Sequence, residues 1–317
     1  MITISVPSKA HLLGEHAVVY GKPALLTAIN RRILITIRSS RKKEVHGAKE
    51  YEKEVRQLLE VLEKEIQKQK KVKSIIPYSI KINSQVPIGS GLGSSAALSA
   101  GLTASLLSFL GLAWDKKIIF DIAYAGEKFF HGNPSGGDLA TVIEGGFLWF
   151  RKDFEFLKTF FPLPFKPHKN IKKFILINSG KPKESTKEMI VRVLKLKESF
   201  PKKIQDLFNL QEELTKRMVT ALRDGDENLL IECIRLGERN LEKLGVVGNK
   251  AKKIIREIEK FGGAAKITGA GGVKGGSGML LAYHKTLDAL DKFFLHSKVS
   301  YNTIALGAEG LRQEKYE

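Results

Sequence analysis

A glycine-rich segment is the first part of the chain whose residue types could do chemistry. It runs from Pro87 to Ala97 and reads PIGSGLGSSAA. Its three glycines let the backbone approach a ligand closely, and Ser94 and Ser95 open a helix whose first amides have no intrahelical partner. The helix dipole places about half a positive charge there, so this end can bind phosphate. The segment lacks the lysine of the P-loop motif, and taken alone it is equally well explained by a structural turn.

Two carboxylates supply a second kind of chemistry. Glu127 lies in a helical pattern, and Asp138 follows eleven residues later in the loop HGNPSGGD, which starts at His131. A phosphoryl-transfer site needs one carboxylate to hold magnesium and one to orient or deprotonate the accepting hydroxyl. Each carboxylate alone is more often a surface charge or a helix cap. The two carboxylates therefore indicate a phosphoryl-transfer site only in combination with the glycine-rich segment.

Charged and histidine residues follow the first predicted strand. Lys9, placed beside an aspartate, would keep that carboxylate ionised and could stabilise charge on a substrate oxygen or phosphate. His11 lies in a largely apolar stretch, which favours a core position. His16 follows Glu15 in a turn flanked by glycines, so it is the better ligand candidate of the two histidines.

A second glycine-rich segment lies near the end of the chain. It begins at Lys266 with KITGAGG and continues through three more glycines to residue 278. This composition permits another close approach of the backbone to a ligand, and Thr268 could contribute a hydroxyl. A flexible hairpin explains the same residues equally well.

The elements that position these residues can be read from periodicity. In the first half we expect strands at 2–6, 33–38, 78–82 and 142–150 and helices at 48–73, 94–112 and 117–130. The helix at 48–73 is amphipathic, with an apolar stripe formed by Val55, Leu58, Leu59, Leu62 and Ile66. The Ala-, Ser- and Leu-rich helix after the glycine segment is suited to burial against a sheet.

Prolines 162, 164 and 167 predict a linker and a domain boundary. Beyond them we expect a strand at 173–177, helices at about 184–199, 203–223, 226–243 and 248–261, and strands at 264–267, 279–283 and 303–306. Because helices and strands are segregated, the pattern indicates an α+β fold rather than repeated parallel βαβ units.

Length and composition limit the size of the core, the disulfide content and the expected location of the protein. With 317 residues, 43% of them hydrophobic, the chain can bury one large or two smaller cores. Cys233 is the only cysteine, which excludes an intramolecular disulfide and favours a packed thiol. We find no pattern of a signal peptide or a membrane span, and so expect a cytoplasmic protein.

The charge balance indicates what kind of ligand the surface attracts. Lys and Arg exceed Asp and Glu by 53 to 34, a net charge of +19 that attracts anions. The basic runs contain interspersed acids and few aromatic residues, which favours a solvated surface over a nucleic-acid-binding one. A basic nucleic-acid-binding protein remains the alternative from another functional class.

Together these segments resemble the motifs of the GHMP kinase family, named from galactokinase, homoserine kinase, mevalonate kinase and phosphomevalonate kinase. The stretch KAHLLGEHAVVYGKPA from Lys9 to Ala24 is similar to the signature of the members that phosphorylate mevalonate, and so is HGNPSG before Asp138. A galactokinase usually has Glu-His-x-Asp-Tyr where this chain continues from Glu15 without an aspartate. Galactose, homoserine and phosphomevalonate stay open as alternative acceptors.

The resemblance implies a role for each matching residue. Asp138 would be the catalytic base, with Lys9 beside it to polarise the 5-hydroxyl of mevalonate. Ser95 (or Ser94) and Glu127 would hold Mg²⁺, and Glu15, His16 and Thr268 would line the mevalonate pocket. ATP would be bound by the ten residues Pro87, Ile88, Gly89, Ser90, Gly91, Leu92, Gly93, Ser94, Ser95 and Ala96.

The resemblance also implies an architecture and two departures from it. A ribosomal-protein-S5-like domain (1–165) would pair with a ferredoxin-like domain (166–317), with the site between them, and a homodimer would be possible. Gly137 stands where the family usually has an aliphatic residue, which would loosen the backbone before Asp138. Val273 and Lys274 lengthen the last glycine motif and would form an added bulge.

Overall fold

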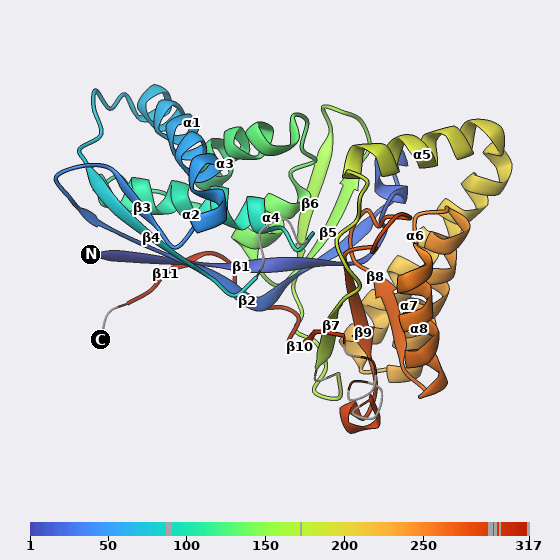
Figure 1. Ribbon diagram of the computed structural model, residues 1–317. Helices are drawn as coiled ribbons and strands as arrows, with labels where there is room; N and C mark the ends of the chain where they lie inside the picture. Colours follow the sequence, from blue (N-terminus) through green and yellow to red (C-terminus); the bar gives the residue numbers. More distant parts are fainter. Residues whose placement is uncertain (87–90, 172, 291–293, 295–296, 298, 316–317) are drawn as a thin grey trace.

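The computed structural model describes residues 1–86, 91–171, 173–290, 294, 297 and 299–315. Two β-sheets form the frame of the molecule, each covered by its own group of helices (Figure 1). The expected α+β fold class is therefore confirmed. The last strand, β11 (Arg312–Gln313), lies at the same end of the larger sheet as the N-terminus (Figure 1).

The larger sheet has seven strands and is built around a long hairpin. β1 (Ile2–Leu13) pairs antiparallel with β2 (Ala24–Ser39), and Lys9 stands opposite Ala28. The sheet order is β11-β1-β2-β4-β3; β5 also pairs with β2, and β6 pairs with β5. The remaining strands are β3 (Glu44–His46), β4 (Tyr78–Ser84), β5 (Phe147–Lys152), β6 (Lys158–Leu163) and β11 (Arg312–Gln313).

Four helices cover the larger sheet: α1 (Glu52–Lys70), α2 (Ser94–Phe109), α3 (Lys116–His131) and α4 (Gly137–Glu144) (Figure 1). The short 3-10 helix η2 (Lys49–Tyr51) precedes α1. The five apolar residues predicted to form the buried stripe of α1 are all buried. Helix α2 is buried on almost every side, because its small side chains let it pack between the sheet and α3.

The smaller sheet has four antiparallel strands in the order β10-β7-β9-β8. They are β7 (Phe174–Asn178), β8 (Ala264–Ile267), β9 (Met279–Tyr283) and β10 (Tyr301–Ile304). The helices of this half are α5 (Thr186–Ser199), α6 (Pro201–Asp224), α7 (Glu227–Lys243), α8 (Asn249–Lys260) and η3 (Leu287–Leu290). Cys233 of α7 is buried in this core, as predicted.

The two halves are joined by more than the linker. The 3-10 helix η1 (Ala17–Tyr20) lies between β1 and β2, and its Tyr20 ring stacks on Phe208 of α6 at 4.7 Å between centroids. After β10 the chain returns to the larger sheet, where β11 pairs with β1. The β1–β2 hairpin therefore contributes to both cores and supplies the surface on which they meet.

Two sequence predictions in this region were wrong. The expected strand at 142–150 begins only at Phe147, and residues 137–144 form α4 instead. The β-branched run Thr141, Val142 and Ile143 suggested a strand, but these residues are buried on a short helix that Gly145 ends. Pro162 lies in β6 rather than in a linker, which is possible because β6 is an edge strand that pairs with β5 alone.

Candidate active site

An ion pair between Lys9 and Asp138 is the centre of the site. Nζ of Lys9, on β1, lies 3.0 Å from Oδ1 of Asp138, in the first turn of α4. Burial acts to raise the pKa of Asp138, but the Lys9 ammonium and then His11 oppose it, and the pKa lies well below its usual range. The position at a helix start also favours a negative charge. The carboxylate is therefore ionised at neutral pH.

The glycine-rich segment packs directly on Lys9. The backbone amide of Lys9 donates to the carbonyl of Leu92 at 2.9 Å. Gly93 has φ of +70°, and a Cβ built on it would lie 2.7 Å from Cγ of Lys9. Glycine is therefore required here both by the backbone conformation and by the lysine behind it. The predicted ATP-binding residues Pro87, Ile88, Gly89 and Ser90 lie outside the described residues.

Ser95, Glu127 and His131 form a second polar group beside the ion pair. Oγ of Ser95 lies 2.9 Å from Nε2 of His131, the last residue of α3. Burial, followed by the charge of Asp138, raises the pKa of Glu127 to about 7, although a hydrogen bond from Ser95 and the charge of Lys9 act against this. Oε1 of Glu127 is buried and has no hydrogen-bond partner. A cation beside this carboxylate would stabilise its charged form.

These residues fit the needs of Mg²⁺. Magnesium is commonly held in kinases by one or two carboxylates together with substrate phosphates, rather than by an all-protein cage. The unpartnered oxygen of Glu127 and the adjacent Ser95 hydroxyl provide such a partial ligand set. Within the described residues, no group of three or more His, Cys, Asp or Glu side chains could hold a metal alone. Ser94, also buried at the start of α2, was the other serine considered for this role.

Glu15 and Thr268, which were expected to line the acceptor pocket, make strong contacts with the protein itself. Glu15 is buried and forms an ion pair with Lys266, a fully buried lysine on β8. Thr268 accepts a hydrogen bond from the backbone amide of His11 at 2.9 Å and donates one to its carbonyl at 3.1 Å. Glu15 therefore connects the turn after β1 to the last glycine motif, and Thr268 connects β1 itself to that motif.

The two histidines near the end of β1 contact different parts of the protein. His16 is buried at a φ of +59°, and its Nε2 lies 3.0 Å from the carbonyl oxygen of Ala270. His11 was expected in the core, but its Nε2 lies 3.6 Å from Oδ1 of Asp138, so that prediction was wrong. The sequence did contain a signal for this position. Side chains two residues apart on a strand point to the same face, so His11 shares one face of β1 with Lys9.

The two departures from the family pattern are accommodated locally. A Cβ on Gly137 would lie 3.0 Å from Phe150 and 3.2 Å from Leu26, so neighbouring side chains fill the space that an aliphatic residue would occupy. The backbone before Asp138 is helical rather than loose. Lys274 in the lengthened motif hydrogen-bonds to Glu184 and Lys183 through its backbone, which joins this motif to the segment after β7.

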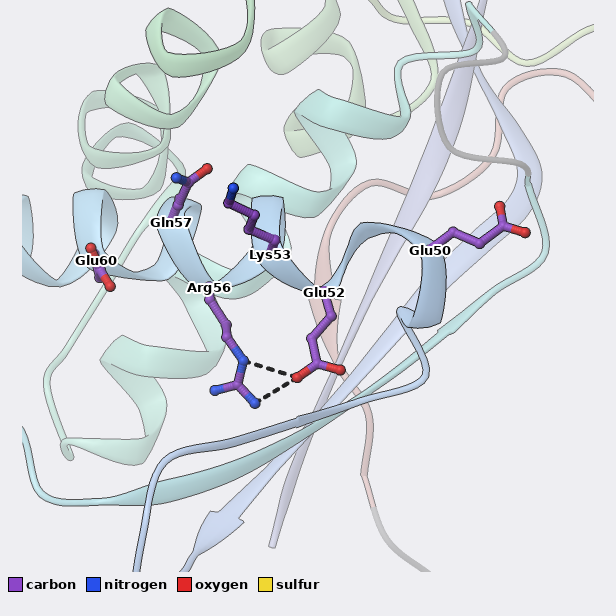
Figure 2. A pocket seen from close by; sticks show the side chains of 6 residues that line it. All are labelled: Glu50, Glu52, Lys53, Arg56, Gln57 and Glu60. Atoms are coloured by element: carbon purple, nitrogen blue, oxygen red, sulfur yellow. Dashed lines mark hydrogen bonds and ion pairs between the residues drawn. The ribbon is translucent and has the colours of Figure 1, made fainter.

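A shallow hollow on the outer face of α1 is separate from this site (Figure 2). It is lined by Glu50, Glu52, Lys53, Arg56, Gln57 and Glu60, and Arg56 pairs with Glu52 at 2.7 Å. Three carboxylates face two cations here, which is typical of a solvated helix face and unfavourable for a polyanion. Among the described residues, no helix combines the length and apolar character that crossing a membrane requires.

Comparisons with known proteins find a matching family model, relatives and a structure of the same fold. Residues 53–146 match the model of the GHMP kinases N terminal domain. A mevalonate kinase of Archaeoglobus fulgidus is 33% identical over 84% of this chain and 88% of its own length. A mevalonate kinase of Thermococcus gammatolerans is 30% identical over 99% of this chain and 98% of its own length. The Methanococcus jannaschii mevalonate kinase structure has the same fold, with a TM-score of 0.80, 23% identity and coverage of 96% of this chain and 98% of that one.

The chain belongs to the GHMP kinase family, and these relatives make it an ATP-dependent small-molecule kinase. Its full-length similarity within that family is to the mevalonate kinases of archaea. The expected GHMP kinase fold is confirmed as well.

Proposed function

We propose that this protein transfers the γ-phosphoryl group of ATP to the 5-hydroxyl of mevalonate, giving ADP and 5-phosphomevalonate. The observation that carries the proposal is the ion pair of Lys9 and Asp138 at 3.0 Å, at the start of α4 and against the glycine motif. The names of the two archaeal relatives support mevalonate as the acceptor.

Asp138 orients the acceptor hydroxyl and receives its proton. Lys9 contacts Oδ1, which leaves Oδ2 as the oxygen for the hydroxyl. A carboxylate with a strongly lowered pKa is a weak base toward an alcohol in the ground state. Phosphoryl transfer passes through a loose transition state, so positioning and charge stabilisation supply most of the acceleration. The proton therefore moves late, after the bond to the phosphoryl group has begun to form.

The start of α2 is the proposed site for the ATP phosphates. The first-turn amides of a helix point outward and favour anions. Glu127 and Ser95 would hold Mg²⁺ beside those phosphates, and the ion would neutralise charge on the phosphoryl oxygens. Lys9 lies between this region and Asp138, and is placed to stabilise negative charge that develops on the acceptor oxygen.

Glu15, His16 and Thr268 are proposed to shape the mevalonate pocket. Their observed contacts fix the end of β1 and the turn after it against the last glycine motif. A wall held by buried ion pairs and hydrogen bonds changes little when substrate binds, which lowers the entropic cost of ordering the pocket.

Substitution of Asp138 is the direct test of this function. In Asp138→Asn the amide keeps the shape of the side chain but cannot accept the proton, so kcat for mevalonate should fall by at least about a hundredfold. Binding of ATP, measured by calorimetry, should persist. The matched control is Asp121→Asn on the exposed face of α3, which should leave kcat unchanged. Near-normal turnover in Asp138→Asn would refute the assignment of the site.

The acceptor itself is tested with a substrate panel. Mevalonate, phosphomevalonate, galactose and homoserine would be incubated with radiolabelled ATP and the wild-type protein. Phosphorylation of another alcohol but not of mevalonate would keep the kinase class and reject the proposed substrate. Steeply salt-dependent RNA binding without any ATP turnover would instead revive the nucleic-acid alternative.

The proposal extends to the setting in which the enzyme works. A cytoplasmic location and a homodimer are both expected for the protein. Light scattering after size-exclusion chromatography would measure the mass in solution against the 35.3 kDa of one chain.

A further inference from the structure

The imidazole of His11 lies against the catalytic carboxylate. Nε2 of His11 is 3.6 Å from Oδ1 of Asp138, the same oxygen that Lys9 contacts at 3.0 Å. The side chain of His11 is 15% exposed and that of Lys9 is 3% exposed, whereas Asp138 is 36% exposed. Two donors therefore approach Asp138 from the buried side, while part of the carboxylate remains open.

We infer that His11 is a positioning residue, which together with Lys9 holds Oδ1 of Asp138 and so aims Oδ2 at the acceptor hydroxyl. This inference rests on the proposed function, because it assigns to His11 a part in the same phosphoryl transfer. The role is additional to that of Lys9: one contact holds Oδ1 in place, and a second contact to the same oxygen from another residue of β1 restricts its movement further.

The surroundings of the ring determine where its proton lies. Nδ1 of His11 is buried without a hydrogen-bond partner, whereas Nε2 faces an ionised carboxylate that can only accept. An unpaired N–H is more costly to bury than an unpaired ring lone pair, so the proton belongs on Nε2. His11 therefore presents an N–H to Asp138.

The ring stays neutral at physiological pH. Burial and the charge of Lys9 lower the pKa of His11, and they outweigh the opposing effects of Asp138 and Glu15. His16, in the turn after β1, also has a lowered pKa because it is buried. A neutral donor orients the carboxylate without adding a second full positive charge, which would weaken it further as a proton acceptor.

The backbone of His11 is fixed from the other half of the molecule. The buried hydroxyl of Thr268 accepts from the amide of His11 at 2.9 Å and donates to its carbonyl at 3.1 Å. The strand cannot move its imidazole away from Asp138 without breaking both hydrogen bonds. Through Thr268, the last glycine motif therefore helps to keep His11 beside Asp138.

The contact at 3.6 Å is longer than a normal hydrogen bond. Catalytic hydrogen bonds are often long without substrate and shorten when it binds. Removal of His11 should therefore change the chemical step more than the binding of ATP.

Two substitutions separate positioning from mere packing. In His11→Gln the side-chain amide can still donate to Asp138, whereas His11→Leu fills the space without a donor. We expect kcat for mevalonate to fall about tenfold in His11→Leu, typical of losing one hydrogen bond to a charged group, and to stay within about threefold of wild type in His11→Gln. The KM for ATP and calorimetric ATP binding should change by less than about twofold in both. His46→Leu, at an exposed histidine on β3, is the matched control and should leave kcat unchanged.

A double-mutant comparison tests whether His11 acts through Asp138. Adding His11→Leu to Asp138→Asn should change the residual rate by less than about twofold, because the oriented group is already absent. An equal tenfold loss in both backgrounds, a harmless His11→Leu, or a His11→Gln as impaired as His11→Leu would each overturn the inference. Failure of the wild-type protein to phosphorylate mevalonate would reject the proposed function instead, so the two failures are distinguishable.

Discussion

The buried carboxylate of Glu127 makes the stability of the metal-free protein depend on pH. Burial raises its pKa from 4.5 to about 7, so the folded protein favours the protonated, neutral form. The resulting stabilisation is fully present below pH 4.5 and is lost as the pH rises through about 7. A rise of about 2.5 in pKa corresponds to about 3 kcal/mol at 1.36 kcal/mol per unit. Glu127→Gln, which cannot ionise, should therefore be about 3 kcal/mol more stable than wild type at pH 8.

The measurement is urea unfolding of both proteins in excess chelator, at intervals between pH 5 and pH 8. The difference in unfolding free energy should be less than about 1 kcal/mol at pH 5 and should grow steadily to pH 8. Glu60→Gln, at an exposed position of α1, is the control and should show no such trend. A difference that is independent of pH, or a less stable Glu127→Gln at pH 8, would refute the reasoning. Adding Mg²⁺ and ADP should favour wild type, since only its carboxylate gains a cation.

Two further substitutions test the supports of the site. Gly93→Ala should lower kcat at least about tenfold, because its Cβ would lie 2.7 Å from Cγ of Lys9. The control is Gly111→Ala, which has a similar φ but no atom within 4 Å of the added Cβ. It should cost only about 1 kcal/mol of backbone strain. A Gly93→Ala enzyme with wild-type kcat would contradict the packing argument. Lys266→Met should lower the unfolding free energy by about 3–5 kcal/mol, because it leaves Glu15 buried without its cation. Urea unfolding would measure this loss, and a loss below about 1 kcal/mol would show that the ion pair contributes little.

The predictable part of the fold was the part governed by local periodicity. The buried stripe of α1 and the all-round burial of α2 followed from residue spacing and composition, which act within a few turns of a helix. The helix at 137–144 was missed because its β-branched residues have strand propensity, whereas the burial of most of this short helix outweighs that preference. Strands β3, β6 and β11 were missed because each is short or lies at an edge, where partners rather than alternation decide pairing.

The chemical types of the candidate residues came from the sequence alone: a glycine-rich helix start, the carboxylates Glu127 and Asp138, and Lys9 after the first strand. Their mutual geometry did not, because it depends on how β1 packs against α4 and α2. Tertiary packing directed His11 toward Asp138 rather than into a core, and it engaged the hydroxyl of Thr268 with the backbone of β1. A sequence determines which groups can donate, accept or ionise, but only the packed chain determines which of them meet and how far burial shifts their pKa values.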